Sequence, residues 1–252
     1  MKKVLAIVLI LVMVFAMASC GKKESVDIFA KSEGTMTYDQ YTAAAEGDKV
    51  VIEGFVQSAA YNAKYGNVNL FLQDDKGAYY VYRAACDDAL AAKLVEGAKV
   101  KVEGEKAAWA GEVEIGEGTG KITVLEGTYK APATDVTAKL GDEAELIKLQ
   151  NQVVTIKGVK VVASKVQDDE TEYAFLYNWD GSGEKGWNSD LYFNVEANGK
   201  TFSFVVESDE CAEGTAVYSA VEGLQVGATV DIDGLLYWYN GPQVHVHNVT
   251  VK

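Results

Sequence analysis

Residues 95–104 (VEGAKVKVEG) and residues 225–234 (QVGATVDIDG) carry one pattern, an alternating β-rich run that ends in glycine. An offset of 130 residues relates the two runs and continues beyond them toward the C-terminus. A self-similar stretch in the same order in both halves of a chain indicates a duplicated structural unit. The paired positions are Gly97 and Gly227, Val100 and Val230, Val102 and Ile232, Gly104 and Gly234, Trp109 and Tyr239, and Gly111 and Gly241.

Each copy predicts the same order of elements, which is three strands, a short helix and two further strands. The strands are expected near 48–58, 68–73, 78–84, 98–109 and 112–125, and near 152–163, 191–196, 201–207, 228–239 and 243–251. The helices are expected at 87–94 and 215–221, with helical lead-ins at 38–46 and 142–149. Five strands with a helix between the third and fourth is the order of an OB-fold, a small Greek-key barrel. We therefore expect a mostly β protein of two tandem OB-fold-like five-stranded Greek-key barrels, each with one short helix between strands 3 and 4 and a helical lead-in; a sandwich of short strands is the competing architecture.

The N-terminus predicts export. Residues 1–3 are basic at two of three positions, and residues 4–18 are apolar and uncharged, which is typical of a secretory signal. Residues 17–21 (MASCG) resemble the lipobox of bacterial lipoproteins, with Met17 in place of the usual leucine. This resemblance implies cleavage before Cys20, lipidation of that residue and anchoring to the membrane. An ordinary secretory signal with an incidental cysteine is the alternative.

The chain is expected to divide into five parts. They are a signal peptide (1–19), a polar tether (20–34), a first barrel (35–128), a linker (129–141) and a second barrel (142–252). Residues 37–47 (TYDQYTAAAEG), residues 73–80 (QDDKGAYY) and the Tyr-Trp-Tyr of the second copy resemble tandem OB-fold lipoproteins of anaerobic Firmicutes. The resemblance implies the fold and an extracytoplasmic location at the membrane, and it assigns no activity and no functional residue.

The charge balance argues against nucleic acid as a partner. Residues 35–128 carry 15 acidic and nine basic side chains, and residues 145–252 carry 16 and seven. Arg83 is the single arginine beside 22 lysines. OB-folds that bind single strands combine stacking aromatics with a basic groove, and this sequence supplies only the aromatics.

Aromatic residues in the second copy form the predicted ligand-binding set. Trp179 and Trp187 lie in a long polar loop between the first two strands, and Tyr237, Trp238 and Tyr239 lie beside the loop between the last two. In OB-folds these loops flank the usual binding face. Planar rings among amides and carboxylates suit a glycan, a peptide or a protein partner. The alternative is that the loop rings pack back on the barrel as a lid; strand parity places Trp238 in the wall or core.

Metal binding receives little support. Residues 178–183 (NWDGSG) partly resemble the start of an EF-hand loop, but Ser189 stands where a bidentate glutamate is needed. His245 and His247 share one face of a strand, where two imidazoles could begin a zinc site that needs three or four ligands. Val244 and Val246 take the inward positions, so we expect both histidines on the exposed outer wall.

No catalytic motif is found, and no cofactor is predicted. Cys86 and Cys211 are expected to be isolated thiols, with a disulfide between them as the alternative. The leading hypothesis is a membrane-anchored, non-catalytic binding module. The alternatives are a structural or assembly spacer, and, less favoured, a nucleic-acid binder or a metal-dependent hydrolase.

Overall fold

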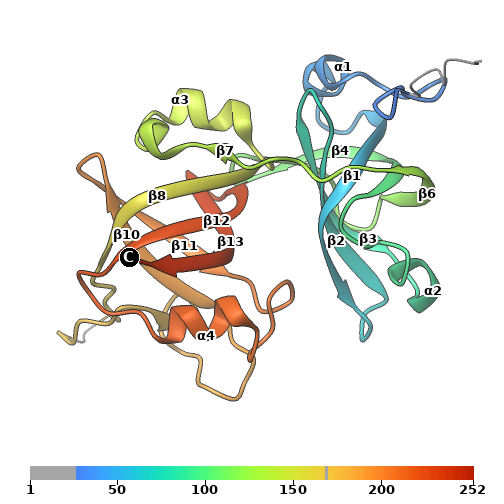
Figure 1. The fold of residues 1–252 in the computed structure, drawn as a ribbon. Helices are drawn as coiled ribbons and strands as arrows, with labels where there is room; N and C mark the ends of the chain where they lie inside the picture. Colours follow the sequence, from blue (N-terminus) through green and yellow to red (C-terminus); the bar gives the residue numbers. More distant parts are fainter. Residues whose placement is uncertain (1–26, 168–169) are drawn as a thin grey trace, which may run out of the picture.

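Two closed barrels, one from each copy of the repeat, make up the protein (Figure 1). The computed structural model describes residues 27–167 and 170–252. The predicted signal peptide, Cys20 and the first part of the tether lie outside the described residues. No helix within the described ranges has the length and apolar character needed to cross a membrane.

The first barrel is closed by pairing between its first and fourth strands. Its strands are β1 (Lys49–Asn62), β2 (Asn67–Gln73), β3 (Ala78–Ala85), β4 (Ala98–Trp109), β5 (Glu112–Ile115) and β6 (Lys121–Thr128). They are ordered β1-β2-β3-β5-β4-β6, and β1 also pairs with β4. β3 and β5 run parallel, and all other neighbours are antiparallel.

The second barrel repeats this arrangement with a continuous last strand. Its strands are β8 (Val153–Val162), β10 (Leu191–Ala197), β11 (Lys200–Val206), β12 (Thr229–Trp238) and β13 (Pro242–Val251), with the short β7 (Thr134–Asp135) and β9 (Leu176–Tyr177) at the edges. The order is β7-β8-β12-β13-β11-β10-β9, and pairing of β8 with β10 closes the barrel. The prediction of two tandem five-stranded barrels is confirmed.

The last strand of the first barrel differs from its prediction. A single strand was expected at 112–125, whereas the structure has β5 and β6 separated by a glycine-rich turn. Gly118 in this turn has a φ of 70°, which glycine adopts at little cost. β5 closes onto β3 and β6 returns along β4, so the split lets one chain segment serve two edges.

Short capped helices lie at the expected places. α2 (Asp88–Ala91) and α4 (Ala216–Glu222) fall between the third and fourth strands, and α1 (Tyr38–Ala43) and α3 (Glu143–Leu146) lead into the barrels. Thr37 and Gln40 form a reciprocal capping box at the start of α1. α3 continues as a 3-10 turn (Ile147–Leu149).

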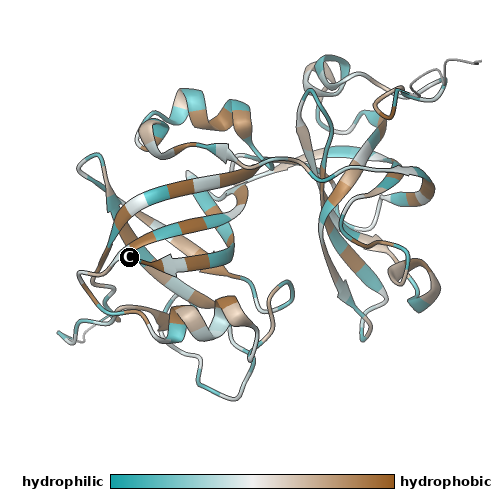
Figure 2. Cartoon of the chain, viewed as in Figure 1, coloured by the Kyte–Doolittle hydropathy of each residue, from teal (hydrophilic) through white to brown (hydrophobic). Residues whose placement is uncertain are grey.

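Each barrel has its own core, and a third apolar cluster joins the barrels. Hydrophobic and hydrophilic residues alternate along the strands (Figure 2), as half-buried walls require. The joining cluster is built from Phe71 and Tyr80 of the first barrel and Leu235 of the second, all buried, with Tyr82, Val153 and Tyr237 packed against it. The outer face of β2 and β3 is therefore covered by the second barrel.

The described part of the tether packs against the first barrel. The Phe29 ring meets Phe55 and Tyr129 edge to face, with centroids 5.7 and 4.9 Å away. The Lys31 Nζ lies 2.7 Å from the Asp74 carboxylate, whose side chain is almost fully buried. Residues 27–34 are thus fixed to the barrel by an aromatic cluster and a buried ion pair.

Candidate ligand-binding groove

The two barrels meet through their last hairpins. The turn after β4 and the turn after β12 touch, because the Asn240 amide donates to the Ala110 carbonyl at 2.7 Å. Buried Glu112 reinforces the contact, accepting from the Trp238 amide at 3.0 Å and from Asn151 Nδ2 at 2.7 Å. Burial raises the pKa of Glu112 to about 8, although both hydrogen bonds oppose this shift. The end of β4, where Trp109 lies, is thereby held against the second barrel.

Beside this junction lies a cavity of about 590 Å³, the aromatic groove. Five of its lining residues are aromatic and three are polar. Trp109 is 64 % exposed, Trp179 is 74 % exposed and Tyr239 is 50 % exposed, so three rings face solvent. Single exposed apolar side chains are common, but a group of large rings around one cavity is typical of a binding site. The lining residues are Trp109, Trp179, Tyr192, Ser203, Glu207, Tyr237, Tyr239 and Gln243.

The structure brings together three of the five predicted binding residues. Trp179, Tyr237 and Tyr239 line the aromatic groove. Trp187 is 66 % exposed, so neither loop tryptophan packs as a lid, but it lies outside the groove lining. Trp238 is buried at 6 % exposure, as parity predicted, and its indole packs over Gly111 of the first barrel.

Sequence reasoning missed Trp109, Tyr192 and Glu207. Trp109 belongs to the first copy, and nothing in the sequence shows that its hairpin reaches the second barrel. The repeat gave a partial signal, since it aligns Trp109 with Tyr239. Both residues of this aligned pair line one groove instead of two equivalent sites.

Glu207 is the one carboxyl group in the groove lining. Its side chain is 29 % exposed, and its Oε1 lies 3.9 Å from His245 Nε2. In the part of the chain that the structure describes, this carboxyl accepts no hydrogen bond. Burial raises the pKa of Glu207 to about 7, and the nearby His245 opposes the shift. The pKa of Tyr192 is raised mainly by burial, and Glu207 is the next largest cause.

The expectation that both histidines are exposed is wrong for His245. Val244 and Val246 do point into the barrel, but the outer face is covered here by the first barrel. The His245 ring lies 5.4 Å from the Phe71 ring and 4.6 Å from the Tyr237 ring. The packing of the first barrel against the second buries the His245 side chain, and the alternation of residues along a strand gives no information about this packing.

Both imidazoles bind one buried carboxylate, Glu210. His245 Nδ1 and His247 Nε2 each lie 2.7 Å from a Glu210 oxygen. Burial opposes ionisation, yet attraction to His245 and hydrogen bonds from both rings lower the pKa of Glu210 to about 2. The same carboxylate raises the pKa of His245 against the effect of burial. The histidines thus serve a structural ion cluster behind the groove.

A smaller cavity of about 230 Å³ adjoins the groove and shares Glu207 and Tyr237 with it. Arg83 lines this cavity, where its guanidinium pairs with Glu117 at 2.9 Å and lies 4.9 Å from the Tyr82 ring centroid. Asp209 and Glu210 add two more carboxylates to the lining. The surroundings of the groove are therefore acidic, and the single arginine is already paired.

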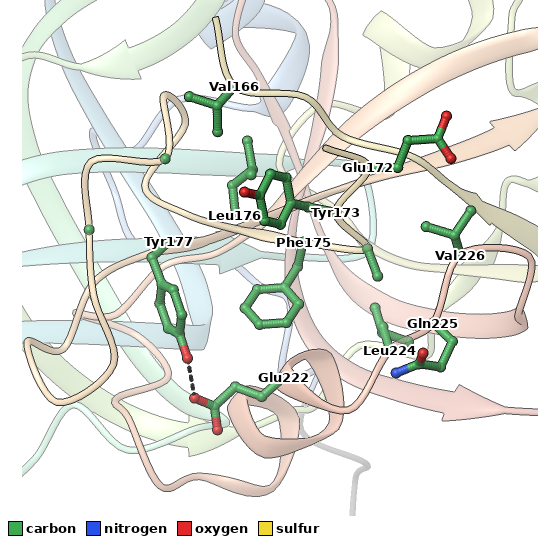
Figure 3. Close-up of a pocket in the computed structure, with 13 residues that line it drawn as sticks. Val166, Glu172, Tyr173, Phe175, Leu176, Tyr177, Glu222, Leu224, Gln225 and Val226 are labelled. Atoms are coloured by element: carbon green, nitrogen blue, oxygen red, sulfur yellow. Dashed lines mark hydrogen bonds between the residues drawn. The ribbon is translucent and has the colours of Figure 1, made fainter. Parts of the chain in front are cut away.

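A separate cavity of about 630 Å³ lies between the long loop and the segment after α4 (Figure 3). Phe175, Leu176 and Leu224 supply apolar walls. At its edge the Tyr177 hydroxyl donates to Glu222 at 2.6 Å, which is drawn as a dashed line. No tryptophan lines this cavity, and its surface is assembled from the second barrel alone.

The predicted calcium ligands engage one another. Asn178 Nδ2 donates to Ser182 Oγ at 3.3 Å, and the Ser182 amide donates to Asp180 at 3.0 Å. Across residues 27–167 and 170–252, no group of three or more His, Cys, Asp or Glu side chains is arranged to hold a metal ion. Cys86 and Cys211 are both free thiols.

The sequence matches no protein-family model, and no curated protein matches it. Among solved structures, a HINa domain in complex with 20-base-pair double-stranded DNA aligns with 81 % of this chain and 98 % of its own, at 15 % identity and a TM-score of 0.34. A murine DNA-binding protein bound with double-stranded DNA covers 80 % and 96 %, at 9 % identity and a TM-score of 0.36. Asparaginyl-tRNA synthetase from Pyrococcus horikoshii covers 34 % of this chain at 23 % identity and a TM-score of 0.28, and the match spans only 22 % of the synthetase. TM-scores this low carry no information about what this chain binds.

Proposed function

We propose that the chain is an extracytoplasmic lipoprotein, anchored through Cys20, that acts as a non-catalytic binding module. Its aromatic groove holds an extracellular glycan, a peptide or a segment of another protein. The observation that carries the proposal is the exposure of Trp109 and Trp179, from different barrels, in one cavity. Covering each indole would contribute roughly 2–3 kcal/mol from the apolar area removed from water.

The polar groups of the groove fit binding better than turnover. Ser203, Glu207 and Gln243 are few and dispersed among rings, as in sites where polar groups fix the orientation of a bound molecule. Glycoside hydrolysis requires a pair of carboxyl groups flanking the bond, and the groove lining has one. A polyanionic ligand is disfavoured because no lysine or arginine of residues 27–167 and 170–252 lines the groove.

Intrinsic fluorescence titration against panels of soluble cell-wall glycans, plant glycans and short peptides tests the binding function. Trp179→Ala and Trp109→Ala should each lower the affinity for any hit at least about tenfold, the equivalent of roughly 1.4 kcal/mol. Trp187→Ala is the matched control, because this ring belongs to the same loop and is similarly exposed outside the groove. Equal losses in all three variants, or the absence of any hit in both panels, would contradict the proposal.

The anchor is tested separately in a bacterial host that processes lipoproteins. The unaltered chain should sediment with membranes and carry acyl chains on Cys20 by mass spectrometry. Cys20→Ala should release the exported protein into the soluble extracytoplasmic fraction. If both forms fractionate identically, the lipid anchor is wrong, while the groove assay is unaffected.

A further inference from the structure

The groove combines aromatic rings with a carboxyl group, Glu207, that accepts no hydrogen bond from the described residues. Glu207 is partly buried, and among the described residues its only charged contact is His245 Nε2 at 3.9 Å. That imidazole is already bound by Glu210 at 2.7 Å through its other nitrogen. His245 is therefore shared with a nearer carboxylate, and among the described residues Glu207 has no close positive partner of its own.

Among the described residues, no lysine or arginine lies over the rings of the groove. Elsewhere in the described chain, lysine or arginine lies over five aromatic rings, at distances from 4.9 to 5.8 Å. None of these five rings belongs to the aromatic groove. Aromatic faces attract cations through the ring quadrupole, and the attraction grows when water is excluded. A carboxyl among aromatic rings that no described lysine or arginine covers is therefore complementary to a positive group on a ligand.

The position of Glu207 places that group near two tyrosines. Tyr192 has its pKa raised by burial and then by Glu207. In Tyr237, burial, Glu112 and Glu114 act first, and Glu207 adds to the shift. Both phenols are thus close enough to sense the charge of this carboxyl, and both line the same cavity.

Resting on the proposed function, we propose that the ligand of the aromatic groove carries an alkylammonium cation, which sits against the tyrosine rings beside Glu207 while the rest of the ligand contacts the indoles of Trp109 and Trp179. The cavity of about 590 Å³ is larger than one ammonium head, which leaves room for that remainder. The acidic surroundings, including Asp209 and Glu210, would raise the local concentration of a cationic ligand.

A neutral glycan fits these observations less well. Hydroxyl groups could donate to Glu207, but a saccharide needs several directional partners, and the lining adds only Ser203 and Gln243 as polar side chains. It would also gain nothing from the negative potential. Neutral saccharides therefore serve as the competing arm of the test.

Choline and its uncharged carbon isostere, 3,3-dimethylbutan-1-ol, are the probes that isolate the charge. The chain has four tryptophans, so ¹⁵N-labelled indoles give four resolved NMR reporters. Choline bound beside Glu207 occupies the cavity that Trp109 and Trp179 also line, so it should shift the Trp109 or Trp179 signal saturably and leave the Trp187 signal in place. The isostere should bind at least about tenfold more weakly, as expected for a desolvated cation–aromatic contact.

Substitution tests the carboxyl. Glu207→Gln keeps the side-chain shape and should weaken choline binding at least about tenfold, whereas Glu46→Gln, which removes an equal charge at an exposed site of the first barrel, should not. The unliganded indole spectrum and melting temperature of Glu207→Gln show whether the fold is intact. N-acetyl-lysine methylamide and its norleucine counterpart distinguish a lysine side chain from a free ammonium compound as the source.

The pH dependence of choline affinity provides a second test of the role of Glu207. His245 lowers the pKa of Glu207, whereas Asp190, Glu210 and Asp209 raise it. The other charged or titratable groups that line the groove or the adjoining cavity are Tyr80, Tyr82, Arg83, Tyr192, Tyr237 and Tyr239. Because the pKa of Glu207 is about 7, choline affinity should fall about tenfold from pH 8 to pH 6 in the unaltered chain and stay level in Glu207→Gln.

The outcomes separate this inference from the proposed function. Equal affinity for choline and its isostere, undiminished binding by Glu207→Gln, or no indole shift with choline each overturns the cationic ligand. Saturable binding of a neutral oligosaccharide without choline binding overturns it too, yet leaves the groove as a binding site. Loss of both indole responses across every panel would instead remove the proposed function itself.

Discussion

Replacing Glu210 with glutamine should make the second barrel lose a pH-dependent part of its stability. The Glu210 side chain is 4 % exposed and accepts from His245 and His247, each at 2.7 Å. These contacts lower its pKa from 4.5 to about 2 in spite of burial. A shift of this size corresponds to about 3 kcal/mol of folding free energy. Glu210→Gln should therefore cost about 3 kcal/mol near pH 5.5, with an amide now facing two imidazoles.

The sign of the pH dependence follows from both partners. A carboxyl with a lowered folded-state pKa stabilises the fold above pH 4.5, and this contribution is lost as the pH falls through about 2. His245 has a raised pKa, so its contribution is complete below 6.5 and is lost as the pH rises through its folded-state value. The cost of Glu210→Gln should be largest between these limits and fall to about 1 kcal/mol at pH 3.

Urea unfolding followed by tryptophan fluorescence, at pH values from 3 to 7.5, measures this cost as a difference between variants. The difference removes the common titration of the other acidic residues. Glu46→Gln, an exposed change of equal charge, should show no such profile. A Glu210→Gln cost that is the same at pH 3 and pH 5.5, or below about 1 kcal/mol at both, would refute the reasoning.

Two further substitutions test the junction between the barrels, and a third tests the attachment of α1 to the first barrel. Trp238→Ala should cost about 3–5 kcal/mol in chemical denaturation because it empties a buried indole site, whereas Trp187→Ala should change stability by less than about 0.5 kcal/mol. Gly111→Ala should cost about 1–3 kcal/mol, because Gly111 has a φ of 93° and an added Cβ would lie 2.7 Å from Trp238 Cδ1. The melting temperature of this variant should fall, while its circular dichroism spectrum should show unchanged secondary structure. Lys106→Met should cost about 2–3 kcal/mol in chemical denaturation, because the Lys106 ammonium donates to three backbone carbonyls at the end of α1 at 2.7–2.9 Å. Unchanged stability of this variant would show that these carbonyls find other hydrogen-bond partners.

The order of helices and strands could be predicted because it depends on short-range sequence signals. Alternation of residue type, turn dipeptides and capping residues each act over a few positions, and the repeat supplied a second copy of every signal. The inward parity of Leu236 and Trp238 likewise held through the irregular pairing at Gly234. These features depend on a strand and its immediate neighbours.

The groove could be predicted only in part because it depends on docking between barrels. The outer face of a barrel strand is expected to be exposed to solvent, and this expectation led to the prediction that His245 is exposed. Here the face is covered by Phe71, a contact between residues 174 positions apart in the chain. Trp109 was missed for the same reason. Hydrophobic periodicity reports that a residue is buried or exposed within its own barrel, and it contains no information about the partner barrel.

The covering of β2 and β3 also breaks the symmetry that the duplication suggests. In the second copy the corresponding strands supply Tyr192 and Ser203 to the groove, whereas in the first copy Phe71 and Tyr80 are sealed under the other barrel. The two copies therefore do not provide two equivalent ligand-binding sites. Calorimetric titration of the intact chain should saturate at one ligand per chain, because only one of the two copies presents an open groove.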